Sequence, residues 1–164
     1  MTAPVFVSGA LTWWSGLYTD HHAVSVTVRF LHLAGLLLGG GTALAADRQL
    51  LAAARGGVAP RESALALARS AHRIVVPALA VMALTGGLMA AADLETFLHS
   101  RLFWIKMVVV GLLLTNGGLL VLAERAAVGG NIDRVWTRLR VASAASLALW
   151  LAALLAGTWL TVAA

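Results

Sequence analysis

The stretch Leu102-Phe-Trp-Ile-Lys-Met-Val-Val-Val-Gly-Leu-Leu-Leu114 decides the fold, because it is apolar throughout and carries a single charge. It opens a segment at 102–123 that is long enough to cross a bilayer core as a helix, which takes about 20 residues. Three other segments share this length and apolar character, at 23–46, 74–92 and 141–163. Short connections between them make antiparallel neighbours. The sequence therefore predicts an all-α integral membrane protein, an up-down four-helix transmembrane bundle over 23–164.

The composition excludes most soluble classes. Only 12% of the 164 residues are charged and the mean hydropathy is +0.88, whereas a soluble domain needs far more polar surface. The absence of cysteine excludes disulfides, thiolate metal sites, iron–sulfur clusters and covalent c-type haem. No phosphate-binding loop, dinucleotide fingerprint, catalytic triad or zinc motif occurs.

Basic residues gather in alternate loops. They are Arg48, Arg55, Arg61, Arg69 and Arg73 between the first two segments, and Arg125, Arg134, Arg138 and Arg140 between the last two. Such an asymmetry sets orientation by the positive-inside rule. We therefore expect a multi-pass protein of the bacterial cytoplasmic (inner) membrane, with both Arg-rich loops cytoplasmic and both termini outside. The pI near 11.4 then reflects topology and contact with lipid, and we expect no nucleic-acid partner.

Residues 1–22 form a separate N-terminal segment. The stretch 4–18 is short for a span and contains Phe6, Trp13, Trp14 and Tyr18, which prefer the membrane interface. We interpret it as an outer interfacial or re-entrant segment, and a fifth span remains an alternative.

The candidate site consists of ionisable residues inside the spans. Lys106 is the only lysine, and Arg29 and His32 lie three positions apart near the start of the first span. Ionisable residues at membrane depth are functional candidates, and the topology puts these three in the outer leaflet. An imidazole can ligate haem iron, so His32 is the predicted metal ligand, and His21, His22 or His99 is an alternative source of a second axial ligand. Arg29 and Lys106 are predicted to pair with haem propionates or to act in catalysis, with proton transfer or snorkelling as alternatives.

Other polar and small residues have weaker interpretations. Asn116, Thr85 and the serines of the last span are expected to bond to neighbouring helices. His72 either snorkels at the inner end or belongs to a separate inner site. Glycine clusters at 39–41, 86–87 and 117–118 indicate close helix packing or room for a flat cofactor.

Three short motifs carry a family resemblance. His32 and Arg48 bracket fifteen residues of the first span, His72-Arg-Ile-Val-Val-Pro77 opens the second, and Arg101-Leu-Phe-Trp-Ile-Lys106 opens the third. Over about residues 28–124 the chain resembles the small four-helix membrane proteins of the oxygen-independent bacterial protoporphyrinogen oxidase family. It is also similar to the membrane part of copper resistance protein D.

The resemblance implies a haem b inside the bundle. His32 would be its ligand, Lys106 an essential neighbour, and Arg48 the residue that closes the motif. Asn116 stands where the family often has a histidine, so Asn116 and Arg48 are also candidate cofactor-binding residues. Gly39 and Asp47 depart from the usual tryptophan and proline.

These observations predict a haem b-binding membrane protein that takes part in electron transfer, by porphyrinogen oxidation coupled to quinone if it is an enzyme. The alternative is a non-catalytic structural subunit of a larger membrane complex. Further copies of this chain or subunits of a membrane complex are possible partners in the bilayer. Copper handling is disfavoured, because Met82, Met89 and Met107 form no ligand cluster with the histidines.

Overall fold

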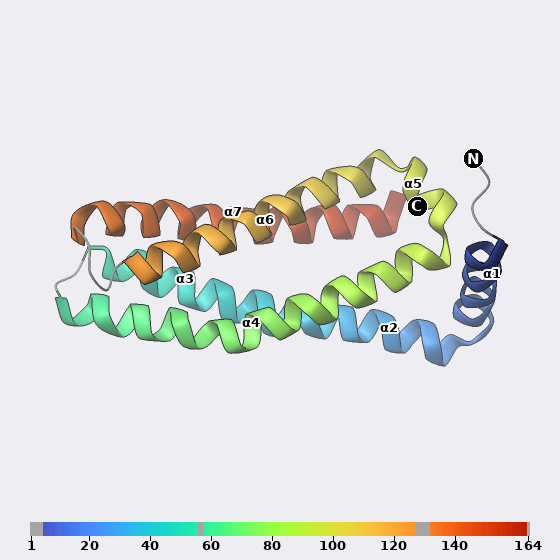
Figure 1. The fold of residues 1–164 in the computed structure, drawn as a ribbon, viewed down its shortest axis with the longest axis horizontal. Helices are drawn as coiled ribbons and strands as arrows, with labels where there is room; N and C mark the ends of the chain where they lie inside the picture. The colour runs from blue at the N-terminus through green and yellow to red at the C-terminus, as the bar shows by residue number, and fades with distance from the viewer. Residues whose placement is uncertain (1–4, 56–57, 127–131, 164) are drawn as a thin grey trace.

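The protein is a bundle of long helices. The computed structural model describes residues 5–55, 58–126 and 132–163, and within those ranges every regular element is helical. Four helices are long and apolar enough to cross a membrane: His22–Ala53, Pro60–Ala92, Arg101–Ala126 and Val135–Leu160. They run up and down along one axis (Figure 1). The predicted fold class, an all-α multi-pass membrane bundle, is confirmed.

The first span contains a change of helix type. It consists of α2 (His22–Gly35), the π-helical turn η1 (Leu36–Gly40) and α3 (Gly41–Ala53), without a break. Single π turns within α-helices are frequent at functional sites. This turn follows His32 by four residues and carries Gly39 and Gly40, so the glycine cluster coincides with the irregular backbone.

Glycines of the first span bring it close to α4 (Val58–Ala92). A Cβ atom on Gly39 would lie 2.7 Å from the Cβ of Ala78, and one on Gly35 would lie 2.8 Å from the Cγ of Met82. The contact with Ala78 requires movement of a helix, and the contact with Met82 requires at least a different side-chain conformation. These glycines therefore serve close helix packing, whereas a Cβ on Gly87 would meet nothing within 4 Å.

The remaining helices complete an antiparallel bundle. They are the short α5 (Leu94–His99), α6 (Arg101–Ala126) and α7 (Ile132–Ala163). All four predicted spans lie within helices, and several helices extend further. In particular, α4 begins well before residue 74, because the Ala- and Leu-rich stretch before it favours helix. The helix breaks that the sequence predicts at Gly56-Gly57 and Gly129-Gly130 lie outside the described residues.

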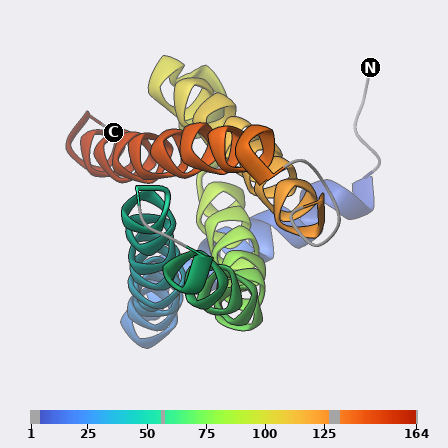
Figure 2. The ribbon, with the colours of Figure 1, turned by 90° about the vertical axis from the view of Figure 1, so that its left-hand side faces the viewer.

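The helices form two pairs that meet at one end. Helix α6 packs mainly on α7, and α2, η1 and α3 pack on α4. Helix α7 joins the pairs by packing on α3, but α2 makes hardly any contact with α6 or α7. Figure 2 shows the α6–α7 pair crossing above the other helices. We call the end where α3 meets α4 and α7 the Arg-rich end, and the opposite end the α1 end.

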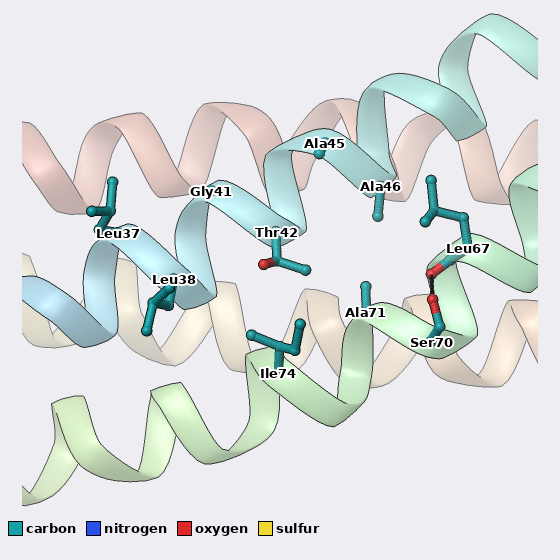
Figure 3. A pocket seen from close by; sticks show the side chains of 10 residues that line it. All are labelled: Leu37, Leu38, Gly41, Thr42, Ala45, Ala46, Leu67, Ser70, Ala71 and Ile74. Carbon is teal, nitrogen blue, oxygen red and sulfur yellow. Dashed lines mark hydrogen bonds between the residues drawn. The ribbon is translucent and has the colours of Figure 1, made fainter.

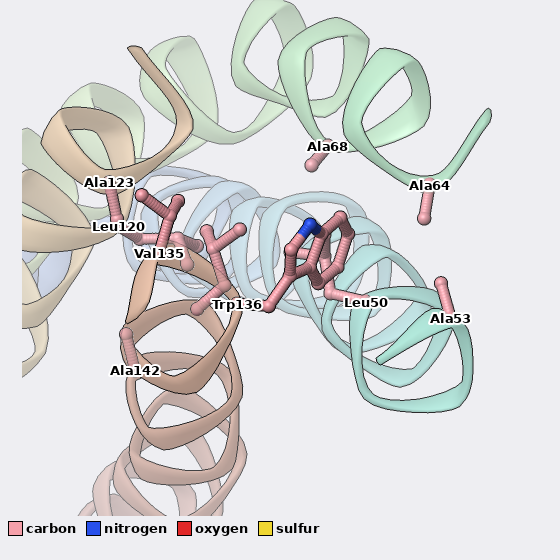
Figure 4. Packing of buried hydrophobic residues seen from close by; sticks show 10 residues of the cluster. Leu50, Ala53, Ala64, Ala68, Leu120, Ala123, Val135, Trp136 and Ala142 are labelled. Carbon is pink, nitrogen blue, oxygen red and sulfur yellow. The ribbon is translucent and has the colours of Figure 1, made fainter. Parts of the chain in front are cut away.

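The apolar core lies at the Arg-rich end. Trp136 of α7 is 5% exposed and lies among Leu50 of α3 and the small residues Ala64 and Ala68 of α4 (Figure 4). The guanidinium of Arg61 is 5.2 Å from the centroid of a Trp136 ring, so this cation covers the core at its edge.

Helix α1 (Val5–Asp20) lies across the end of the bundle instead of along it (Figure 1). Trp14 Nε1 donates to the carbonyl of Leu88 at 2.8 Å, and Ser15 Oγ donates to that of Ala92 at 2.6 Å. Carbonyls in the last turn of a helix lack partners within that helix. The bond to Ala92 therefore caps the last turn of α4, and the bond to Leu88 holds α1 against it. The position of α1 at a membrane interface stays a prediction.

Candidate functional site

His32 is held by a hydrogen bond between two helices. Its Nδ1 lies 3.0 Å from the hydroxyl of Thr85 on α4, and that hydroxyl donates to the carbonyl of Val81 at 2.7 Å. With the proton on Nδ1, the ring donates to Thr85, whose own proton goes to the carbonyl of Val81. In this tautomer the lone pair of Nε2 is available to a ligand.

Helix α4 also makes room for the imidazole. A Cβ on Gly86 would lie 3.2 Å from Cε1 of His32, which is tighter than an ordinary van der Waals contact. Any larger residue at position 86 would push the ring away from Thr85. Neighbouring positions of α4 therefore orient His32 and provide its space.

Lys106 lies on the other helix pair and reaches the same region. It is half-buried on α6, and a Cβ on Gly157 of α7 would lie 3.6 Å from its Nζ. Its ammonium interacts electrostatically with the His32 ring. No hydrogen bond or ion pair links Lys106 to another residue within the described ranges. Lys106 and His32 therefore lie within range of an electrostatic interaction, on opposite helix pairs.

Arg29 does not join them. Its Nε donates to the hydroxyl of Tyr18 at 3.2 Å, and its guanidinium lies 6.0 Å from the centroid of that ring. The exposed side chain thus turns toward α1. An α-helical spacing of three places Arg29 and His32 on one face, but the contact with α1 decides where the long side chain ends.

Arg48 and Asn116 also lie away from His32. Arg48 is exposed on α3, 16 positions after His32 and so about 24 Å further along the helix. Asn116 Nδ2 donates to the carbonyl of Ala142 at 2.9 Å and thereby ties α6 to α7. This is the interhelical role expected of a polar residue in a span.

A second polar group, which the sequence analysis did not assemble, lies toward the Arg-rich end. Asp47 and Glu124 are each 2% exposed. The carboxylate of Glu124 is 3.0 Å from His72 Nε2, and Asp47 lies beside the hydroxyls of Ser143 and Ser146. We call Asp47, His72, Glu124, Ser143 and Ser146 the inner polar cluster. All four spans contribute to it.

Sequence signals for the inner polar cluster exist but are weak. Asp47 and Glu124 stand at the ends of apolar stretches, where acidic residues usually face water, and Ser143 and Ser146 share a helix face. Which face points inward depends on the packing of the helices, so only the structure joins them.

Two surface grooves lie apart from both sites. One, of about 410 Å³, runs between the first span and α4 and is mainly apolar (Figure 3). Its polar members include Thr42 and Ser70, and the latter donates to the carbonyl of Leu67 at 2.8 Å. The other groove, of about 390 Å³, lies between α6 and α7 and includes Asn116. Neither is lined by His32 or Lys106.

The donor set around His32 fits a haem better than a bare metal ion. In the described part of the chain no group of three or more His, Asp or Glu residues could hold a metal ion. A haem iron is already held by its porphyrin and needs only an axial ligand from the protein. His32 Nε2 offers such a ligand, and Lys106 offers a cation for a propionate.

The chain belongs to the DUF6644 family, a family of unknown function, whose profile matches residues 9–163. No curated protein and no solved structure matches the chain. The resemblance to the protoporphyrinogen oxidase family and to copper resistance protein D therefore stays a prediction.

Proposed function

We propose that the protein binds one haem b toward the α1 end of the bundle and takes part in electron transfer within the membrane. The observation that supports this most directly is the pairing of His32 and Lys106. Thr85 fixes the ring so that Nε2 is available, and Lys106 approaches from the opposite helix pair.

Each residue has a distinct role in this proposal. Haem b, when bound, supplies a one-electron redox couple. The hydrogen bond from Nδ1 to Thr85 orients the imidazole, as partners of metal-bound histidines commonly do. Lys106 balances the charge of a propionate, and this interaction is strengthened where water is excluded. Gly86 and Gly157 keep the space around both side chains open.

The proposed reaction follows from the membrane location and the family resemblance. A porphyrinogen would give up electrons and protons, and a quinone dissolved in the bilayer would accept them. The Arg-rich end would face the cytoplasm, by the positive-inside rule. The haem would then lie on the outer side of a bacterial inner membrane.

The test is the reduced-minus-oxidised absorption spectrum of protein purified from haem-supplied cells. We expect a b-type α band in the wild type that disappears in His32→Ala. His99→Ala is the matched control, because His99 bonds only to the carbonyl of Glu95 in the exposed α5. A folded wild type without a Soret band, or an unchanged band in His32→Ala, would disprove haem ligation by His32.

Lys106 is tested by substitution with methionine, which keeps length and removes charge. We expect Lys106→Met to lower haem occupancy or to shift the redox midpoint, while Arg101→Met at the exposed start of α6 changes neither. If Lys106 only snorkels to the headgroups, both variants will keep the haem occupancy and the redox midpoint of the wild type.

A structural subunit is the second candidate, and the outer face of α6 favours it. A Cβ on Gly111, Gly117 or Gly118 would meet nothing within 4 Å. Gly111 and Gly118 are two helical turns apart and so share a face. Small residues on an open face let another membrane helix approach. Copurification of a stable partner, with no cofactor and no effect of Lys106→Met beyond assembly, would support this function instead.

A further inference from the structure

The inner polar cluster has no role in the proposed haem site, since it lies toward the other end of the bundle. We propose that Asp47, Glu124 and His72 bind an exchangeable proton and pass it to and from the water at the Arg-rich end. This goes beyond the proposed function and does not depend on haem.

Burial is the first argument. Asp47 and Glu124 are each 2% exposed, and they interact electrostatically with one another. A buried, ionised carboxylate is costly unless a positive charge compensates it. Two such groups close together also repel each other when both are ionised.

The cluster contains too few positive charges for two carboxylates. His72 on α4 is its only basic side chain in contact with a carboxylate, at 3.0 Å from Glu124. Arg69 donates to the backbone carbonyl of Glu124 at 3.1 Å, and α7 contributes only the hydroxyls of Ser143 and Ser146. Among the other arginines whose side chains the structure describes near this end, Arg61 is half-buried against Trp136. The rest are exposed: Arg48, Arg55, Arg73, Arg125, Arg138 and Arg140. Protonation of one acid therefore brings the cluster close to neutrality.

An unsatisfied atom indicates what is bound. Glu124 Oε1 is buried and has no hydrogen-bond partner among the described residues. Protonation of the Glu124 carboxyl removes the negative charge that this atom would otherwise share without a partner. A metal ion fits less well, because the described residues contain no group of three ligating side chains. Imidazole is also a poor ligand for sodium or calcium, which prefer oxygen.

His72 provides a route to water. Its side chain is 30% exposed, in contrast to the buried acid beside it. The imidazolium can release the proton on Nε2 to Glu124 Oε2, forming the carboxyl O–H bond. In the reverse step the carboxyl returns this proton to Nε2, and the imidazolium then releases a proton to water. Histidine suits this task because its charge changes near neutral pH.

The test is infrared difference spectroscopy of the protein in lipid vesicles, between about pH 5 and pH 8. We expect the carbonyl band of a buried carboxylic acid to change with pH and to shift in heavy water. Asp47→Asn or Glu124→Gln should remove this band. Glu62→Gln is the control, since Glu62 is an exposed carboxyl of α4 toward the same end.

Further variants keep the proposal falsifiable if one acid is needed for folding. His72→Gln should leave the band but slow its hydrogen–deuterium exchange severalfold. A folded wild type without a pH-dependent band would overturn the proposal, as would a band that survives both Asp47→Asn and Glu124→Gln. A response to sodium at constant pH would indicate a cation site instead. None of these measurements requires bound haem, so failure of the haem proposal would be recognised separately.

Discussion

The two ends of the bundle are packed differently. At the Arg-rich end α3, α4, α6 and α7 enclose Trp136, Leu139 and a layer of alanines, and the polar residues there are buried. At the α1 end α2 hardly touches α6 or α7, and His32 and Lys106 are only half-buried. One end therefore holds the helices together, and the proposed haem site lies at the other, more loosely packed end.

The largest effect that tests this division is expected for Trp136→Ala. The indole fills the space between α3, α4 and α7. Its removal leaves a cavity, which should lower the free energy of unfolding by about 3–5 kcal/mol. Trp159→Ala on the same helix is the control, because Trp159 is 59% exposed at the α1 end. Unfolding in detergent monitored by circular dichroism would measure both. Equal losses would contradict the view that stability resides at the Arg-rich end.

The contact between the first span and α4 is the next test. We expect Gly39→Val to cost about 1–3 kcal/mol, because even its Cβ would collide with Ala78. Displacement of η1 should also weaken the hydrogen bond between His32 and Thr85 one turn away. The matched control is Gly87→Val, since Gly87 has open space around its Cα. The same unfolding measurement applies, and equal tolerance of both changes would show that the helices can separate freely.

Hydropathy was sufficient to predict the four spans, because a bilayer-length apolar run has few alternatives to a transmembrane helix. The shared depth of His32 and Lys106 also followed, since alternate helices in an up-down bundle start on the same side. The rotation of each helix about its own axis, which decides which side chains point inward, could not be predicted from the sequence. The hydrophobic pattern of a span faces lipid as well as protein, so it does not mark the inward face.

The missed and misplaced residues illustrate this limit. The sequence shows Asp47 and Glu124 only as acidic residues at the ends of spans. The structure places Asp47 beside serines of α7 and Glu124 beside His72 of α4. Arg29 shares a helix face with His32, yet Tyr18 of α1 holds its head group. Both outcomes depend on contacts between segments distant in sequence, which periodicity within one helix does not contain.

The smallest expected effect concerns Asn116, which the sequence assigned to the cofactor and the structure bonds to Ala142. Asn116→Leu removes one interhelical hydrogen bond, and such bonds in membranes contribute about 0.6 kcal/mol on average. We therefore expect a slight loss of stability and an unchanged absorption spectrum. Thr115→Val beside it is the control, because Thr115 bonds only within α6, to the carbonyl of Gly111. Loss of the haem band in Asn116→Leu alone would extend the ligand site by about 15 Å along α6 from Lys106. The separation between a packed end and a binding end would then no longer hold.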